Sequence, residues 1–108
     1  MTITFPKTVR ICHLDFTIKE VDQNWDGEAQ FGECDVARQT ITVKRHLPSD
    51  AFTCEVFIHE CLHAYYALAN LTEGDTEERV VNALGVGITQ LLRDNRKWLI
   101  PLLEEATK

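Results

Sequence analysis

Residues 49–68 read SDAFTCEVFIHECLHAYYAL, and this stretch decides the second half of the fold. Apolar residues recur in it every three or four positions, which is the spacing of one face of an amphipathic helix. Ser49 or Asp50 is placed to cap the first turn. The residues predicted to face the core are Cys54, Ile58, Cys61, Leu62, Tyr65 and Leu68.

The same stretch contains the motif HExxH, formed by His59, Glu60 and His63. Residues four apart share a helix face, so both imidazoles can bind one zinc ion. Bound zinc lowers the pKa of a coordinated water, and Glu60 is placed to accept its proton. Two histidines do not complete such a site, so the motif predicts a third protein ligand elsewhere.

A loop over residues 70–75 and a second helix should follow the motif. Thr76 is its expected N-cap, and the helix should end near Asn95. The tail over residues 98–103 is interrupted by Pro101 and is expected to form a short packed segment. The apolar stripe expected to face the core comprises Val81, Leu84, Ile88 and Leu91.

The region before the motif has the alternation of half-buried strands. Period-2 patterns cover residues 8–11, 14–19 and 40–44, and Phe31 is placed to begin the partner of the last. Residues 24–27 are typical of a turn. The short connections favour antiparallel hairpins. We therefore expect one α+β domain over residues 1–108, a small antiparallel sheet followed by two main helices.

Candidates for the third ligand lie at the start of the second helix. Glu77 falls on the stripe of Val81, whereas Glu78 falls on a stripe with Asn82 and Gly85, small or polar residues that would allow close helix packing. Either carboxylate would also stabilise the helix simply by placing a negative charge near its N-terminus. Spacing alone leaves the two open.

Composition narrows the class of protein. A net charge of −6 argues against nucleic-acid binding, which relies on clustered Lys and Arg. Neither a signal-peptide pattern nor an apolar run of membrane-spanning length occurs, so a cytoplasmic protein with no membrane partner is expected. In that compartment its four cysteines should be reduced.

Beyond these patterns, the segment from Ser49 to Asn95 resembles small phage and prophage HExxH proteins and, more distantly, the ImmA/IrrE-type metallopeptidases. The resemblance rests on HECLH and on residues 78–84, ERVVNAL, followed by Gly87-Ile88 and Asp94-Asn95. In that family the second helix supplies a Glu ligand, followed three and four residues later by a small apolar residue and often Asn. The matching residue here is Glu78.

This resemblance implies a minimal zincin-like core and a zinc-dependent hydrolase of peptide bonds in peptide or protein substrates. Glu60 would be the catalytic base, and His59, His63 and Glu78 the zinc ligands. An extended substrate could pair with an exposed sheet edge, for which residues 40–44 are the candidate. The alternatives are a non-catalytic, zinc-stabilised phage regulatory or binding protein and a metal-free interaction domain.

Other side chains near the motif are expected to play lesser parts. Cys61 and Tyr65 should belong to the core. Tyr66 lies nearer the histidine face and is a weaker candidate for hydrogen bonding to a reacting oxygen. Glu55 could line the site, although a solvated face is expected for it, and His13 and His46 should lie at the surface or in a turn.

Overall fold

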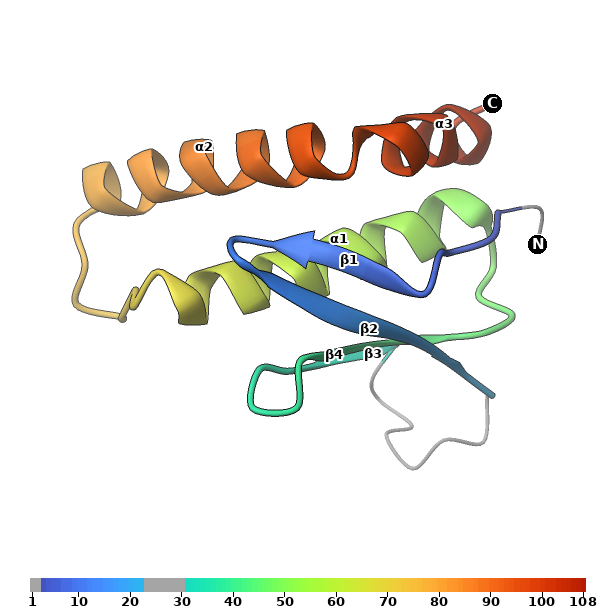
Figure 1. The fold of residues 1–108 in the computed structure, drawn as a ribbon, viewed down its shortest axis with the longest axis horizontal. Coiled ribbons are helices and arrows are strands. Elements are labelled where there is room, and N and C mark those ends of the chain that lie inside the picture. Colours follow the sequence, from blue (N-terminus) through green and yellow to red (C-terminus); the bar gives the residue numbers. More distant parts are fainter. Residues whose placement is uncertain (1–2, 23–30) are drawn as a thin grey trace.

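The computed structural model describes residues 3–22 and 31–108, and the turn expected at residues 24–27 lies outside them. Within these residues, strands precede helices in an α+β arrangement, as the sequence predicts (Figure 1). The strands are β1 (Thr8–Ile11), β2 (Leu14–Val21), β3 (Gly32–Asp35) and β4 (Thr40–Lys44). The helices are α1 (Asp50–Leu68), α2 (Glu77–Asp94) and α3 (Arg96–Ala106).

The expected antiparallel hairpins β1–β2 and β3–β4 are confirmed, but the sheet as a whole is mixed, so the expectation of an entirely antiparallel sheet was wrong. Its order is β1-β2-β4-β3, with β2 and β4 parallel and the other two pairs antiparallel. Strand β4 lies between β2 and β3 and has the largest share of buried residues of the four strands: Ile41, Thr42 and Val43 are all buried. A central position removes both of its edges from water.

The free edges of the described sheet are therefore β1 and β3. Residues 40–44, expected at an exposed edge, form the inner strand β4, and that expectation was wrong. Strand β3 lies against α1 and pairs with β4 on one side only. Its other edge is free among the described residues and lies beside the motif helix.

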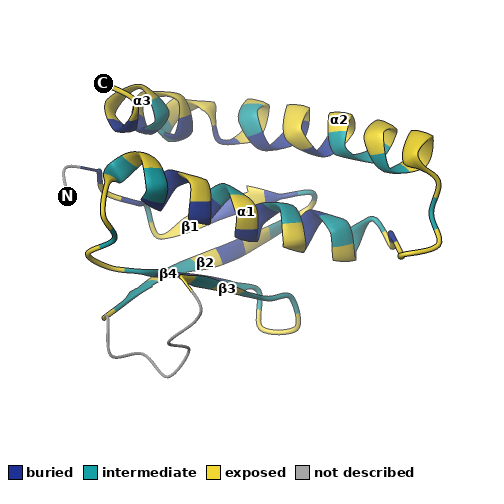
Figure 2. Ribbon diagram, turned by 180° about the vertical axis from the view of Figure 1, so that it is seen from behind, coloured by how far each residue is buried: buried dark blue, intermediate teal, exposed yellow. Residues whose placement is uncertain are grey.

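The core lies between α1 and one face of the sheet (Figure 2). Phe57 is its centre: its ring centroid lies 4.8 Å from that of Phe5 and 5.9 Å from that of Trp98. Val9 and Phe16 are fully buried, as their alternation predicts. Burial of such side chains from both halves of the chain is the main stabilising term.

Helix α2 begins after Thr76 and ends before Asn95, as predicted, but its buried face differs from the prediction. Val81 and Ile88 are 55% and 43% exposed, whereas Leu91 is buried. The residues of α2 that are buried are Gly87, Gln90 and Leu91. The turns before Gly87 therefore bury no residue completely, and Figure 2 shows this half of the helix exposed on its outer side.

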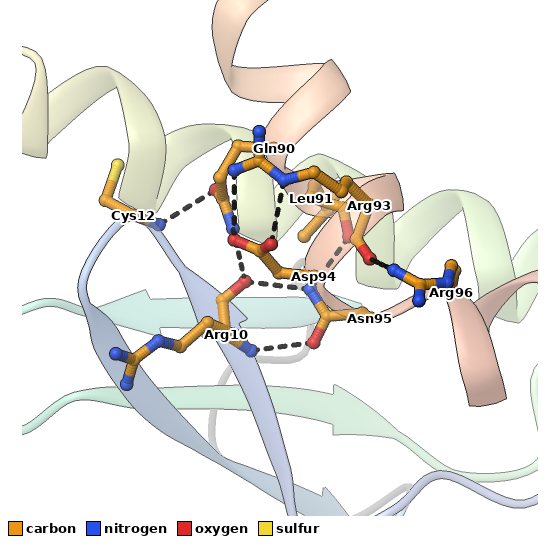
Figure 3. Close-up of polar contacts among 8 residues, drawn as sticks. All are labelled: Arg10, Cys12, Gln90, Leu91, Arg93, Asp94, Asn95 and Arg96. Carbon is orange, nitrogen blue, oxygen red and sulfur yellow. Dashed lines mark hydrogen bonds and ion pairs between the residues drawn. The ribbon is translucent and has the colours of Figure 1, made fainter.

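Polar side chains attach the C-terminal half of α2 to β1 (Figure 3). Asn95 Oδ1 accepts from the Arg10 amide at 2.8 Å, and its Nδ2 donates to the Arg10 carbonyl at 2.8 Å. Gln90 Oε1 accepts from the Cys12 amide at 2.8 Å. We call these contacts the β1–α2 clamp. They set the rotation of α2, which apolar periodicity alone did not predict.

Helix α3 occupies the tail for which only a short packed segment was expected. Leu99, Leu102 and Ala106 are buried on one face. Pro101 lies inside the helix on an exposed position and removes only the hydrogen bond to the carbonyl of Lys97, which is also exposed. Water can satisfy that carbonyl, so the proline does not end the helix. Among the described helices, none is long and apolar enough to cross a membrane.

Candidate metal centre

The orientation of α1 is determined by its cap and its buried face. Ser49 Oγ accepts a hydrogen bond from the Phe52 amide at 3.1 Å, which confirms Ser49 as the N-cap. Phe57 and Cys61 are fully buried against the sheet. With that face inward, His59 and His63 lie on the exposed side of the helix.

The two histidines converge. Their Nε2 atoms are 3.0 Å apart, and their ring centroids are 4.7 Å apart. Two nitrogen ligands of a tetrahedral zinc ion, each about 2.0–2.1 Å from the metal, lie roughly 3.3 Å from one another. A hydrogen bond between neutral imidazoles also accounts for the distance. In either case the helix brings both nitrogens to one point, as the motif predicts.

Glu60 lies beside the pair but is held between α1 and β3, where it is only 8% exposed. Burial raises the pKa of its carboxyl group above the ordinary value, and nearby Glu33 adds to this effect. His59 and His63 act in the opposite direction. A carboxyl group in this environment favours its protonated form more than a solvated glutamate does.

The close approach of β3 to α1 requires a glycine. A Cβ atom on Gly32 would lie 2.9 Å from the Thr42 carbonyl oxygen, 2.9 Å from Val56 Cγ1 and 3.1 Å from Glu60 Cγ. These distances are shorter than ordinary van der Waals contacts. Gly32 thus allows the edge strand to pack directly over the motif helix.

Between β3 and α1 runs an open cleft of about 860 Å³. It contains the three motif residues, and Tyr66 and Glu55 also line it. The remaining lining residues are Phe31, Gly32, Glu33, Cys34, Val36, Phe52, Val56 and Ala67. The β3 side of this cleft was missed by the sequence analysis, because nothing in residues 31–36 indicates which helix they contact.

Cys34 is one of the cleft residues that the sequence analysis did not single out. Burial, followed by the charges of Glu60, Asp35 and Glu33, raises its thiol pKa to about 11. A thiol with this pKa is protonated near neutral pH and is a poor metal ligand in that form. Cys61 is buried in the core, as expected, and burial raises its pKa as well.

The structure does not bring the expected third ligand to the histidine pair. Glu77 and Glu78 are both exposed in the first turn of α2, and neither lines the cleft. Over residues 3–22 and 31–108, no three His, Cys, Asp or Glu side chains are grouped so that they could hold a metal ion. The motif thus supplies two convergent donors and an adjacent carboxyl group, and the position of α2 leaves Glu78 apart from them.

Tyr65 is buried under α2 and belongs to the core, as predicted, whereas Tyr66 faces the cleft. His13 is exposed in the turn between β1 and β2.

Comparison with known proteins gives no further assignment: no protein family, curated protein or solved structure matches this chain.

Proposed function

We propose that the cleft between β3 and α1 is the active site of a zinc-dependent peptide hydrolase. The observation that carries the proposal is the convergence of His59 and His63 Nε2 at 3.0 Å beside the buried carboxyl group of Glu60. This is the donor set that a catalytic zinc site takes from one helix. The resemblance to phage HExxH proteins supports the same function.

The third ligand in this proposal is Glu78, brought to the histidines by repacking of the N-terminal half of α2. Residues 77–86 bury no side chain completely, so few apolar contacts oppose such a movement. Gly85 has open space around it, and a helix packed on this face could approach α1 closely. Metal binding supplies enough free energy to reorganise a marginally packed segment, about 10–16 kcal/mol in small zinc domains.

In this proposed site Glu60 transfers a proton from the attacking water to the leaving amine. Bound zinc would polarise the scissile carbonyl and activate a water molecule. A Glu60 carboxylate oxygen accepts the proton of that water and then donates it to the leaving amine. Its position between α1 and β3 restricts the side chain, so the proton acceptor stays beside the histidines.

The free edge of β3 is suited to hold the substrate. The Lys44 amide donates a hydrogen bond to the Phe31 carbonyl at 2.8 Å, so the backbone carbonyl of Phe31 is directed toward β4. Hydrogen-bonding directions alternate along an antiparallel strand, which leaves the amide and carbonyl groups of Gly32 and Cys34 directed to the free edge. An extended peptide could add to this edge as a further strand, in the place first expected for residues 40–44.

Zinc content and one conservative variant test the proposal. The protein purified without chelator should hold close to one zinc per chain, measured by elemental analysis. Glu60→Gln should keep the metal. Its rate of hydrolysis of a peptide that the wild type cleaves should fall by about a hundred- to ten-thousand-fold, because only the proton acceptor is removed. Absence of zinc uptake, or loss of zinc in Glu60→Gln, contradicts the proposed roles.

The choice of third ligand has its own test. Chelator competition should show weaker zinc binding for Glu78→Ala than for Glu77→Ala, its neighbour in the same exposed turn. The reverse order would assign the ligand to Glu77.

One observation favours a second candidate, a zinc-stabilised binding protein without catalysis. Among the described residues only two donors converge, so the metal could serve to dock α2 rather than to activate water. In that case Glu60→Gln should behave as the wild type in every assay, whereas Glu78→Ala should lose both zinc and stability.

A further inference from the structure

An exposed aromatic pair lies at one end of the cleft. Phe31 is 45% exposed, and its ring meets that of Phe52 edge-on, with centroids 5.1 Å apart. Phe31 immediately precedes β3, and Phe52 lies in the first turn of α1. Val56, one turn further along α1, completes an apolar surface that opens into the cleft.

The Phe31 side of this surface is exposed, whereas Phe52 also packs against the core. The carbonyl of Phe31 is bound by the Lys44 amide, so the backbone that carries the ring is part of the sheet ladder. Large apolar side chains of soluble proteins are exposed singly as a rule, whereas apolar surfaces inside a cleft are typical of ligand contact. The pair therefore offers a rigid, open contact for an apolar group.

The distance from the aromatic pair to the histidines determines how many residues of an extended peptide would separate the two contacts. Phe52 precedes the midpoint between His59 and His63 by nine positions, which is about 13 Å at 1.5 Å per residue. An extended peptide advances about 3.3 Å per residue, so the same distance corresponds to roughly four residues. The opposite end of the cleft, at Tyr66 and Ala67, lies closer to the histidines along α1.

We infer that Phe31 and Phe52 form a specificity subsite for a large apolar side chain of an extended peptide. That side chain is about four residues from the bond held at the histidine pair. The inference rests on the proposed function for the position of the reacting bond. The free edge of β3 supports a peptide as the occupant, because Gly32 and Cys34 of that edge line the same cleft as the aromatic pair.

The test measures peptide binding separately from cleavage. A positional library of labelled peptides is titrated against zinc-loaded Glu60→Gln by fluorescence polarisation, and again without zinc. One position should prefer Leu, Ile or Phe over Ala by about tenfold to a hundredfold, the range expected for burying such a side chain. In wild-type digests, that position should lie about four residues from the cleaved bond.

Variants connect the preference to the aromatic pair. Phe31→Ala and Phe52→Ala should each remove most of the preference for an apolar peptide side chain. Phe52→Leu, which keeps an apolar side chain in a half-buried position, should retain it. Val86→Ala is the matched control, because Val86 is 66% exposed on α2 and outside the cleft. Circular dichroism and thermal unfolding confirm that each variant is folded.

The outcomes separate this inference from the proposed function. Zinc binding and cleavage without an apolar preference, or a preference unchanged in both Ala variants, overturns the subsite and leaves the hydrolase. A preference that depends on Phe31 and Phe52 in a protein without zinc or cleavage supports the subsite and refutes the hydrolase.

Discussion

Helices α1 and α2 have nearly equal lengths, 19 and 18 residues, yet they are held in different ways. Helix α1 buries eight residues against the rest of the protein, whereas α2 buries three, all in its C-terminal half. Burial fixes the rotation of α1 and therefore the direction of His59 and His63. The first half of α2, which carries Glu78, has no comparable constraint.

The difference shows that one chain can combine a rigid part, α1 with β3, and a less constrained part, the first half of α2. The motif helix and β3 are in close contact, with Gly32 allowing the approach. The β1–α2 clamp attaches only the far end of α2 (Figure 3). Regions with few buried apolar contacts open at lower free energy than the core does. The four predictions below test this contrast, from the largest expected effect to the smallest.

Removing the Asn95 contacts of the clamp should have the largest effect. Asn95→Ala leaves the amide and carbonyl of Arg10 without their partner in a partly buried site. We expect the free energy of unfolding, measured by urea denaturation, to fall by about 2–4 kcal/mol. Asn82→Ala, at an exposed position of the same helix, should stay within about 0.5 kcal/mol of the wild type. Equal losses would mean that both halves of α2 are held alike.

A methyl group between β3 and α1 should disturb the rigid part. Gly32→Ala places its Cβ within 3 Å of the Thr42 carbonyl oxygen and Val56, so the strand must shift. The expected loss in free energy of unfolding is about 1–3 kcal/mol. Gly74→Ala is the control, since its nearest contact is 3.9 Å away. If Gly32→Ala is as mild as the control, β3 does not pack tightly on α1.

Two glycines of α2 should respond in opposite directions. A Cβ on Gly87 would lie 2.6 Å from the ring of Tyr65, whereas one on Gly85 would have nothing within 4 Å. Gly87→Ala should destabilise the protein by about 1–3 kcal/mol. Gly85→Ala should stabilise it by up to about 1 kcal/mol through helix propensity. Thermal unfolding measures both, and a loss for Gly85→Ala would show that this face of α2 is covered.

The helix caps should give the smallest difference. Ser49 caps α1 and Thr76 caps α2, each accepting a hydrogen bond from an amide three residues on. Ser49→Ala should lower the free energy of unfolding by about 1 kcal/mol, because the first turns of α1 are part of the core. Thr76→Ala should mainly speed hydrogen exchange in the first turns of α2, with a smaller global loss. Equal global losses would mean that the start of α2 is as firmly integrated as that of α1.

Particular residues show which features of the structure could be predicted from the sequence. The HExxH spacing predicted the convergence of His59 and His63, and Ser49 and Thr76 were recognisable as caps, because these features depend on neighbours within one or two turns. Val81 and Ile88 were expected in the core but are exposed. Their periodicity is helical in either orientation, and the rotation of α2 follows from Gln90 and Asn95 contacting a strand about 80 residues earlier.

The sequence by itself determined most of the elements, with α3 as the exception among the helices, and the donor pair, since helix spacing, capping and strand alternation are local. Only the tertiary structure decided that β4 is inserted beside β2, that β3 forms the wall of the cleft, and that Glu78 lies apart from the histidines. Each of these depends on pairing between distant segments. Such pairing is governed by the burial of Ile41 and Val43 and by the fit of Gly32 against Val56. No local pattern encodes those contacts, because the same alternation and the same glycine are compatible with several strand orders.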